Sequence, residues 1–394
     1  MKRFLKDSFI NVFSNMILVS SLQLMIFPLI SRNENNDYFA ILISIYGIIL
    51  ILATSFGNTL NNVRLINNKF ISDEEKEGIF TRYIIKIILI NMIIIIIVLG
   101  YYSVDLINSI FIVFFTILLT LRYYLNVYFR EKLNYKKMFL TNISVIIGYL
   151  IGLIIYLSIF KFYGFIFFLG ELSGFLFLSI HTSFRIKNIS SLKNAKIFYD
   201  YKNYVQINLI INVMNYLDRI ILLPIVGSVA MTTYFIGFTA SKVLSMLTTP
   251  INNVILSYLS LNDKSKHYFS KLIIIFILMT LPMFFIIKYL SLIIVKILYN
   301  NYLLEVSNYM NLIVIICLLS IYNSIVYPFA MNLLKSNLIL KIQLYYALFY
   351  LFIAVGLSLK YNLYGFCIAT ILALLLKLIV IIYFSRVQIN IKEG

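Results

Sequence analysis

The chain has 394 residues, of which 62% are hydrophobic and only 12% are charged, with a formal net charge of +18. Soluble domains average about 45–50% apolar and about 25% charged residues, so the composition excludes a soluble fold, which could not cover this much apolar surface with polar groups. The positive charge would suit nucleic-acid binding in a soluble chain, but here it predicts an orientation in a membrane, because the basic residues follow the loops between apolar stretches.

Apolar stretches long enough to cross a bilayer recur along the whole chain. A helical span needs about 20 apolar residues, whereas a barrel strand alternates over about ten. Continuous runs such as Ile84–Leu99 therefore favour helices. We predict an all-α integral membrane fold with twelve transmembrane helices. They are expected at residues 9–31, 38–60, 80–101, 106–127, 138–160, 164–184, 203–226, 229–258, 268–290, 306–332, 338–359 and 362–384.

Lys and Arg residues alternate between the two sides of this arrangement. One side, which includes both termini, carries 23 of the 33, at positions 2, 3, 6, 64, 69, 76, 82, 130, 132, 136, 137, 185, 187, 193, 196, 202, 264, 266, 271, 335, 341, 386 and 392. The other side carries five, at Arg32, Lys161, Lys288, Lys296 and Lys360. Because cytoplasmic loops are enriched in Lys and Arg, both termini are predicted to be cytoplasmic.

The two longest loops lie around residues 61–79 and 185–202. The second loop divides the chain into residues 1–190 and 191–394, and we predict a six-helix lobe for each. Neither Cys317 with Cys367 nor His181 with His267 has metal-ligand spacing, so no cofactor and no metal site are predicted. The first loop carries an acidic patch, interpreted as a solvated loop face, at Asp73, Glu74, Glu75 and Glu77.

Polar residues recur at helical spacing inside several predicted spans. In the seventh span, Asn208, Asn212, Asn215 and Arg219 are spaced i, i+4, i+7 and i+11 and share one helical face. Within a bilayer such a face must contact other helices or water. We interpret these faces as the border of a hydrated cavity, and the alternative is a buried structural hydrogen-bond network. Similar groups occur at Thr54, Asn58 and Asn61 and at Lys242, Ser245, Thr249 and Asn253.

Charged residues inside the predicted spans are mostly cations. Lys86 and Arg122 lie near cytoplasmic ends, where long side chains can reach the headgroups, while Lys242 and Lys377 lie deeper. Arg and Lys suit phosphate, so a net-positive cavity predicts an anionic substrate, whereas an exporter of cationic drugs would need unpaired carboxylates. The five cations are Lys86, Arg122, Arg219, Lys242 and Lys377, and the two anions are Glu171 and Asp218.

The stretch Asn215–Ser260 resembles the seventh and eighth spans of polysaccharide repeat-unit flippases. These proteins are the O-antigen and capsule branch of the multidrug/oligosaccharidyl-lipid/polysaccharide (MOP) exporter superfamily. The chain departs from the family pattern at Tyr258 and Asn300. The matching residues are Asp218-Arg219, Gly227, Tyr234, Ala240 with Lys242, and Pro250, and further similarity lies in Phe27–Arg32, Phe168–Glu171 and Val295–Tyr302.

The resemblance implies a MATE-like exporter architecture in the bacterial cytoplasmic (inner) membrane and a flippase rather than an enzyme. The implied substrate is an undecaprenyl-pyrophosphate-linked oligosaccharide for capsule, O-antigen or exopolysaccharide synthesis. Transport would proceed by alternating access with a cationic cavity. The implied cavity residues are Arg219, Lys242, Lys377, Arg122, Lys86, Asn212, Asn215 and Asn58.

Energy coupling and partners also follow from the resemblance. Asp218 and Glu171 are the candidate carboxylates for coupling to H⁺ or Na⁺, and a polysaccharide polymerase and other membrane proteins of the pathway are the expected partners. Three alternatives stay open: a lipid II flippase, a multidrug or cation antiporter of the same superfamily, and a membrane polymerase or ligase. The last would need a large outer loop carrying Arg or His, and every predicted outer loop is short.

Overall fold

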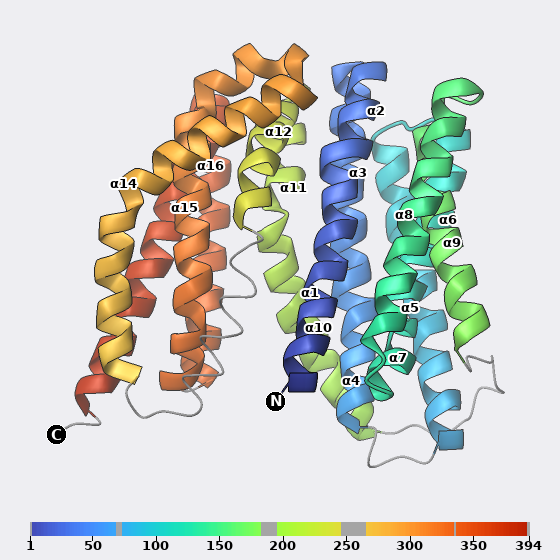
Figure 1. Ribbon diagram of the computed structural model, residues 1–394, viewed down its shortest axis with the longest axis horizontal. Helices are drawn as coiled ribbons and strands as arrows, with labels where there is room; N and C mark the ends of the chain where they lie inside the picture. Colours follow the sequence, from blue (N-terminus) through green and yellow to red (C-terminus); the bar gives the residue numbers. More distant parts are fainter. Residues whose placement is uncertain (1, 68–72, 183–194, 246–264, 335, 392–394) are drawn as a thin grey trace. The chain divides into compact units, whose positions relative to one another are not determined.

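The computed structural model describes residues 2–67, 73–182, 195–245, 265–334 and 336–391, and all regular elements in these ranges are helices (Figure 1). The helices are α1 (Lys2–Ser21), η1 (Leu22–Ile26), α2 (Phe27–Asn33), α3 (Asn36–Leu52), η2 (Ala53–Asn58), α4 (Thr59–Asn67), α5 (Asp73–Tyr101), α6 (Leu106–Leu125), α7 (Val127–Glu131), α8 (Tyr135–Ser158), α9 (Tyr163–His181), α10 (Ala195–Asn215), α11 (Leu217–Ile225), α12 (Ser228–Ser245), α14 (Ser265–Leu298), η3 (Asn300–Tyr302), α15 (Leu303–Leu333) and α16 (Ser336–Ile391).

The described residues contain nine helices long and apolar enough to cross a membrane, or ten if the bent pair α10 and α11 forms one span. This confirms a multi-pass, all-helical membrane protein. The long helix α16 covers two predicted spans, with non-helical backbone at Tyr361 and Asn362 between them. The predicted span 229–258 begins as α12 and continues outside the described residues. The count of twelve spans stays a prediction.

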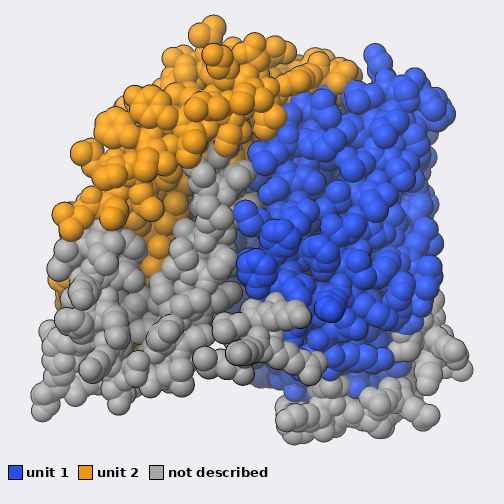
Figure 2. Space-filling model, viewed as in Figure 1, with its two compact units in different colours: residues 1–30, 41–220 blue, residues 31–40, 221–394 orange. Residues whose placement is uncertain are grey.

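The chain forms two compact units, which Figure 2 distinguishes by colour. Unit 1 consists of Met1–Ile30 and Ile41–Ile220, and unit 2 consists of Ser31–Ala40 and Ile221–Gly394. Helix α10 packs against α4 and η2 within unit 1. The division into lobes of residues 1–190 and 191–394 therefore stays a prediction, because these units follow packing rather than the count of spans.

Close helix packing in unit 1 depends on glycine. A Cβ added at Gly148 would lie 2.5 Å from the carbonyl oxygen of Leu169, and one at Gly152 would lie 2.8 Å from the Cα of Ile166. On the opposing helix, a Cβ at Gly170 would collide with the ring of Tyr149. The sequence motifs Gly148-x-x-x-Gly152 and Gly170-x-x-x-Gly174 predict this close approach, and the packing of α8 on α9 confirms it.

Two π-helical turns interrupt the first two spans. The first, η1, directly precedes α2, in which Pro28 lacks the amide that an uninterrupted ladder would need. The second, η2, contains Ser55 and Gly57, both buried. Such π turns occur often at functional sites because they change the direction of side chains on an otherwise regular helix. Here η2 is the surface on which α10 packs.

Unit 2 is built around α12, α14, α15 and α16, with α15 packed against the other three. Hydroxyl pairs join the helices within an apolar core, as in Ser241 with Ser291 (3.1 Å) and Thr280 with Tyr322 (2.8 Å). Such interhelical bonds satisfy polar side chains that lipid cannot. The thiol of Cys317 also lies in this core, where it donates to the carbonyl oxygen of Ser241.

Candidate functional site

A sharp bend between α10 and α11 positions Arg219, a buried cation of unit 1. Helices α10 and α11 meet at an angle of 52° around Tyr216. The amide of Arg219 donates to the carbonyl oxygen of Tyr216 (3.1 Å), so α11 starts a new turn directly after the bend. Pro224 lies further along α11 and is not at the bend. The break places Arg219 in the first turn of α11.

The guanidinium of Arg219 lies over two tyrosine rings. Its central carbon is 4.9 Å from the ring centroid of Tyr216 and 5.9 Å from that of Tyr46, and only 7% of the residue is exposed. Cation–π contact of this kind stabilises a charge that has little access to water. Helix α3 leaves room for the side chain at Gly47, where a Cβ would lie 2.3 Å from the Cδ of Arg219.

The polar face of α10 contacts the π turn η2 and the first residue of α4. Asn208 donates to the hydroxyl of Thr59 (2.7 Å), and Asn212 donates to the hydroxyl of Ser55 (3.0 Å). The structure thus joins the polar faces of the second and seventh spans through these two hydrogen bonds. Asn215 is exposed and Asn58 is half-buried.

Arg122 and Glu171 form a buried ion pair between α6 and α9. Arg122 donates from Nε to Oε2 and from Nη2 to Oε1 (3.0 Å), while Glu171 is fully buried. Tyr149 donates to the same carboxylate (2.9 Å), and Asn142 accepts from Nη1 of Arg122 (3.2 Å). Arg122, predicted to bind an anion, and Glu171, predicted to couple ions, therefore form an ion pair with each other.

The remaining predicted site residues are dispersed. Lys86 is exposed on α5, and Asp218 is half-buried at the start of α11. Lys377 belongs to unit 2, where its Nζ lies 4.6 Å from the ring centroid of Tyr346. The side chain of Lys242, on α12, lies outside the described part of the structure. Among the predicted site residues, Arg122 and Glu171 are seen to contact each other in the described part of the structure.

A third buried arginine in unit 1, after Arg219 and Arg122, was missed by the sequence reasoning. Arg64 is 2% exposed and donates to Glu77 (2.6 Å), Glu131 (3.0 Å) and the hydroxyl of Tyr124 (2.8 Å). In the sequence, Arg64 was considered only as one of the basic residues that predict the orientation in the membrane. The interpretation of Glu77 as part of a solvated loop face is wrong, because its carboxylate also accepts from Tyr128. The sequence signal that could have indicated these ion pairs is the presence of Glu77 and Glu131 next to basic residues of the predicted cytoplasmic loops.

No protein-family model matches the chain, and no curated protein matches it significantly in sequence. Solved structures do match. The lipid II flippase MurJ, in an inward closed conformation, aligns with a TM-score of 0.69 at 12% identity over 96% of this chain and 86% of that chain. An inward-facing multidrug resistance MATE family transporter aligns with a TM-score of 0.63 at 10% identity, over 98% and 94%.

The chain has the fold of MOP superfamily transporters. A third member, from Pyrococcus furiosus, aligns with a TM-score of 0.64 at 10% identity over 99% of this chain and 97% of that chain. That transporter is described by the reverse polarity of its binding pocket, which suggests a different function. These structures are of transporters and a flippase, not of enzymes. The predicted MATE-like architecture is confirmed at the level of fold.

Proposed function

We propose that this protein is a flippase that moves undecaprenyl-pyrophosphate-linked oligosaccharides from the inner to the outer leaflet for capsule, O-antigen or exopolysaccharide synthesis. The observation that carries the proposal is Arg219, a buried cation held over the rings of Tyr216 and Tyr46 on a MOP transporter fold. A charge at membrane depth is costly, and those that persist commonly mark substrate pathways.

The chemistry of this cluster suits a pyrophosphate headgroup. A guanidinium presents several N–H donors in one plane and matches phosphate oxygens well. The surrounding phenols of Tyr216 and Tyr46 can donate to or accept from sugar hydroxyls. Arg219 therefore acts as the anion-binding residue in the proposal, with Lys242 and Lys377 as further cations of the transport path.

The contacts of the buried carboxylate of Glu171 support an anionic substrate over a cationic one. A drug-cation antiporter needs a carboxylate available to the cation, but Glu171 accepts hydrogen bonds from both Arg122 and Tyr149. An inside-negative membrane potential favours outward movement of an anion by about 2.3 kcal/mol per charge for each 100 mV crossed. Transport by alternating access would thus have a driving force even without H⁺ or Na⁺ coupling through Asp218.

A lipid II flippase is the second candidate, and the structural similarity to MurJ favours it. Both substrates carry a pyrophosphate on a polyprenyl chain, so the proposed role of Arg219 is the same for either. The difference lies in the sugar and in its use by the cell. Deleting the gene separates the two, because loss of a surface polysaccharide with normal growth supports our proposal, whereas loss of viability supports lipid II.

The proposal is tested by complementing the deletion strain with single variants at matched protein levels. We expect Arg219→Ala and Lys242→Ala to reduce surface polysaccharide strongly while lipid-linked repeat units accumulate in the inner leaflet. Lys132→Ala is the matched control, since it removes a cation from an exposed loop position that is not a candidate cavity residue, and it should leave polymer output close to that of the unaltered protein. Normal output from both test variants would overturn the role of these cations.

A further inference from the structure

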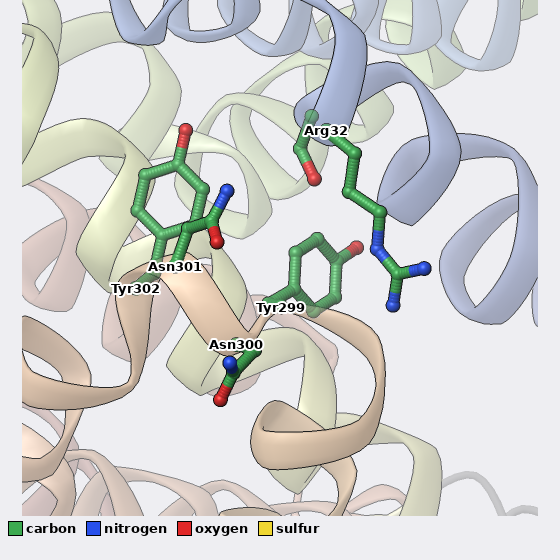
Figure 3. A pocket seen from close by; sticks show the side chains of 6 residues that line it. Arg32, Tyr299, Asn300, Asn301 and Tyr302 are labelled. Atoms are coloured by element: carbon green, nitrogen blue, oxygen red, sulfur yellow. The ribbon is translucent and has the colours of Figure 1, made fainter.

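A polar pocket lies in unit 2 where α14 ends and α15 begins (Figure 3). Its volume is about 280 Å³, and its lining residues belong to unit 2, whereas Arg219 belongs to unit 1. Small-molecule sites begin at about 300 Å³, so the pocket suits a single ring rather than a whole oligosaccharide. The lining residues are Ser31, Arg32, Tyr299, Asn300, Asn301 and Tyr302.

The pocket is built by a tight connection and held by one arginine. Helix α14 ends at Leu298, the backbone leaves the helical region at Tyr299, and a single 3-10 turn leads into α15. Nη2 of Arg32 donates to the carbonyl oxygens of Ile297 (2.8 Å) and Leu298 (3.1 Å). These are final carbonyls of α14, where a cation also meets the negative end of the helix dipole. Arg32 thus fastens the end of α2 to this connection.

The groups that line the pocket are mainly neutral hydrogen-bonding groups. Asn300 and Asn301 are exposed, and each amide both donates and accepts. Tyr299 is 2% exposed, and burial raises the pKa of its phenol, which keeps the hydroxyl protonated. Tyr302 is half-buried and offers a ring together with a hydroxyl. Figure 3 shows these side chains gathered around the pocket.

This composition favours a neutral polyhydroxyl ligand over an anion or a metal ion. The cation in the lining, Arg32, directs Nη2 at the carbonyls of α14, and Glu305 adds a negative charge in the first turn of α15. None of the six lining residues is a carboxylate, which hard metal ions would require. Amides and phenols instead match the hydroxyl groups and the apolar face of a sugar ring.

We propose that this pocket is a saccharide subsite that binds one sugar of the transported oligosaccharide. The proposal rests on the proposed function and assigns the sugar to residues of unit 2, whereas the headgroup-binding arginine belongs to unit 1. The charge pattern predicts that Arg32 and Lys296 lie on the outer side of the membrane. The subsite would therefore hold the sugar on the side where the substrate is released.

The absence of tryptophan from the chain gives a direct test. Tyr302→Trp would place a single tryptophan in the pocket of the full-length protein, which is then purified and reconstituted in lipid nanodiscs. The probes are the water-soluble oligosaccharide that mild acid releases from the source cell's lipid-linked repeat units, and inorganic pyrophosphate. We expect a saturable change in tryptophan emission with the oligosaccharide and no change with pyrophosphate.

Two matched variants make the result specific. Tyr361→Trp places the single tryptophan at the bend of α16, where the native residue is 49% exposed, and its emission should not respond. Adding Asn301→Ala to Tyr302→Trp should weaken oligosaccharide binding about five- to tenfold, the effect of losing one or two hydrogen bonds. Thermal stabilisation of the unaltered protein by the oligosaccharide, reduced by Asn301→Ala, provides the same test without a reporter.

The proposal is overturned if the oligosaccharide neither changes the emission nor raises the melting temperature. A response to pyrophosphate, or an equal response from Tyr361→Trp, would overturn it as well. The experiments distinguish a failure of the subsite from a failure of the proposed function. If Arg219→Ala abolishes export but no oligosaccharide binds, the flippase proposal stands and the subsite fails. If the oligosaccharide binds but deletion of the gene leaves all surface polymers intact, the flippase proposal fails.

Discussion

The buried arginines of unit 1 all lie over tyrosine rings. Arg64 and Arg122 also form ion pairs with carboxylates from other helices of unit 1. Ion pairs of this kind contribute to holding helices in place. In the proposed function Arg219 is the anion-binding residue, and its contacts with the rings of Tyr216 and Tyr46 stabilise the buried charge.

The Arg122–Glu171 pair predicts a non-additive mutational pattern. Arg122→Met or Glu171→Leu alone should destabilise unit 1 by about 3–5 kcal/mol, because each leaves an uncompensated buried charge. The double variant should recover most of this loss, since both charges are gone. Thermal unfolding of the purified protein in detergent measures the effect. A double variant no more stable than either single variant would contradict the structural role.

The same three variants also test ion coupling. If Glu171 carried a coupling H⁺ or Na⁺, the double variant would be stable yet inactive in polymer export. We expect it to retain export once stability is restored. Measuring unfolding and polymer output on the same variants separates the two roles of the carboxylate.

At the scale of helices, the second span and the α10–α11 bend together determine where Arg219 lies. The space for its side chain comes from Gly47 on α3. In Gly47→Ala the new methyl group would force the guanidinium away from Tyr46. A loss of about 1.4 kcal/mol in headgroup binding lowers the affinity for the substrate tenfold, so we expect polymer output to fall. The protein should still accumulate, because alanine stabilises a helix relative to glycine by about 0.5–1 kcal/mol.

Gly100→Ala and Gly356→Ala are the controls for this change. A Cβ at either position meets no atom within 4 Å, so both variants gain the same helix propensity without a collision. Polymer output from them should match that of the unaltered protein. The Arg219 assignment would be weakened if Gly47→Ala behaved in the same way as these two variants.

Sequence predicted the helices far better than their contacts. Span positions and the glycine pair Gly148 and Gly152 could be recognised because hydropathy and small-residue spacing are local properties. The Arg122–Glu171 pair could not, since helical periodicity identifies a face but not the helix that meets it. The bend at Tyr216 could not be predicted, because no proline or glycine lies at that position. The π turn η2 could not be predicted either, because its amino-acid composition does not distinguish it from an α-helical turn. The polar face of α10 was therefore detected, but its partner Ser55 was not.

At the scale of the whole molecule, the orientation in the membrane rests on the alternation of basic residues. Lys161 and Lys132 make a matched pair for testing it, because both are exposed loop residues in unit 1. Cysteine at position 161 should react with a membrane-impermeant maleimide in intact cells, and cysteine at position 132 only after permeabilisation. Background labelling should be low, because Cys317 and Cys367 are both buried. The reverse pattern would invert the predicted topology.

The chain passes from one compact unit to the other three times, after residues 30, 40 and 220. Residues 31–40 contribute to unit 2 although the helices on either side of them belong mainly to unit 1, and α10 contributes to unit 1 although it follows the mid-chain loop. Neither half of the polypeptide thus contains all of either unit. Halves produced from two separate genes would have to exchange these segments before either unit was complete, which makes the continuous chain part of the assembly process.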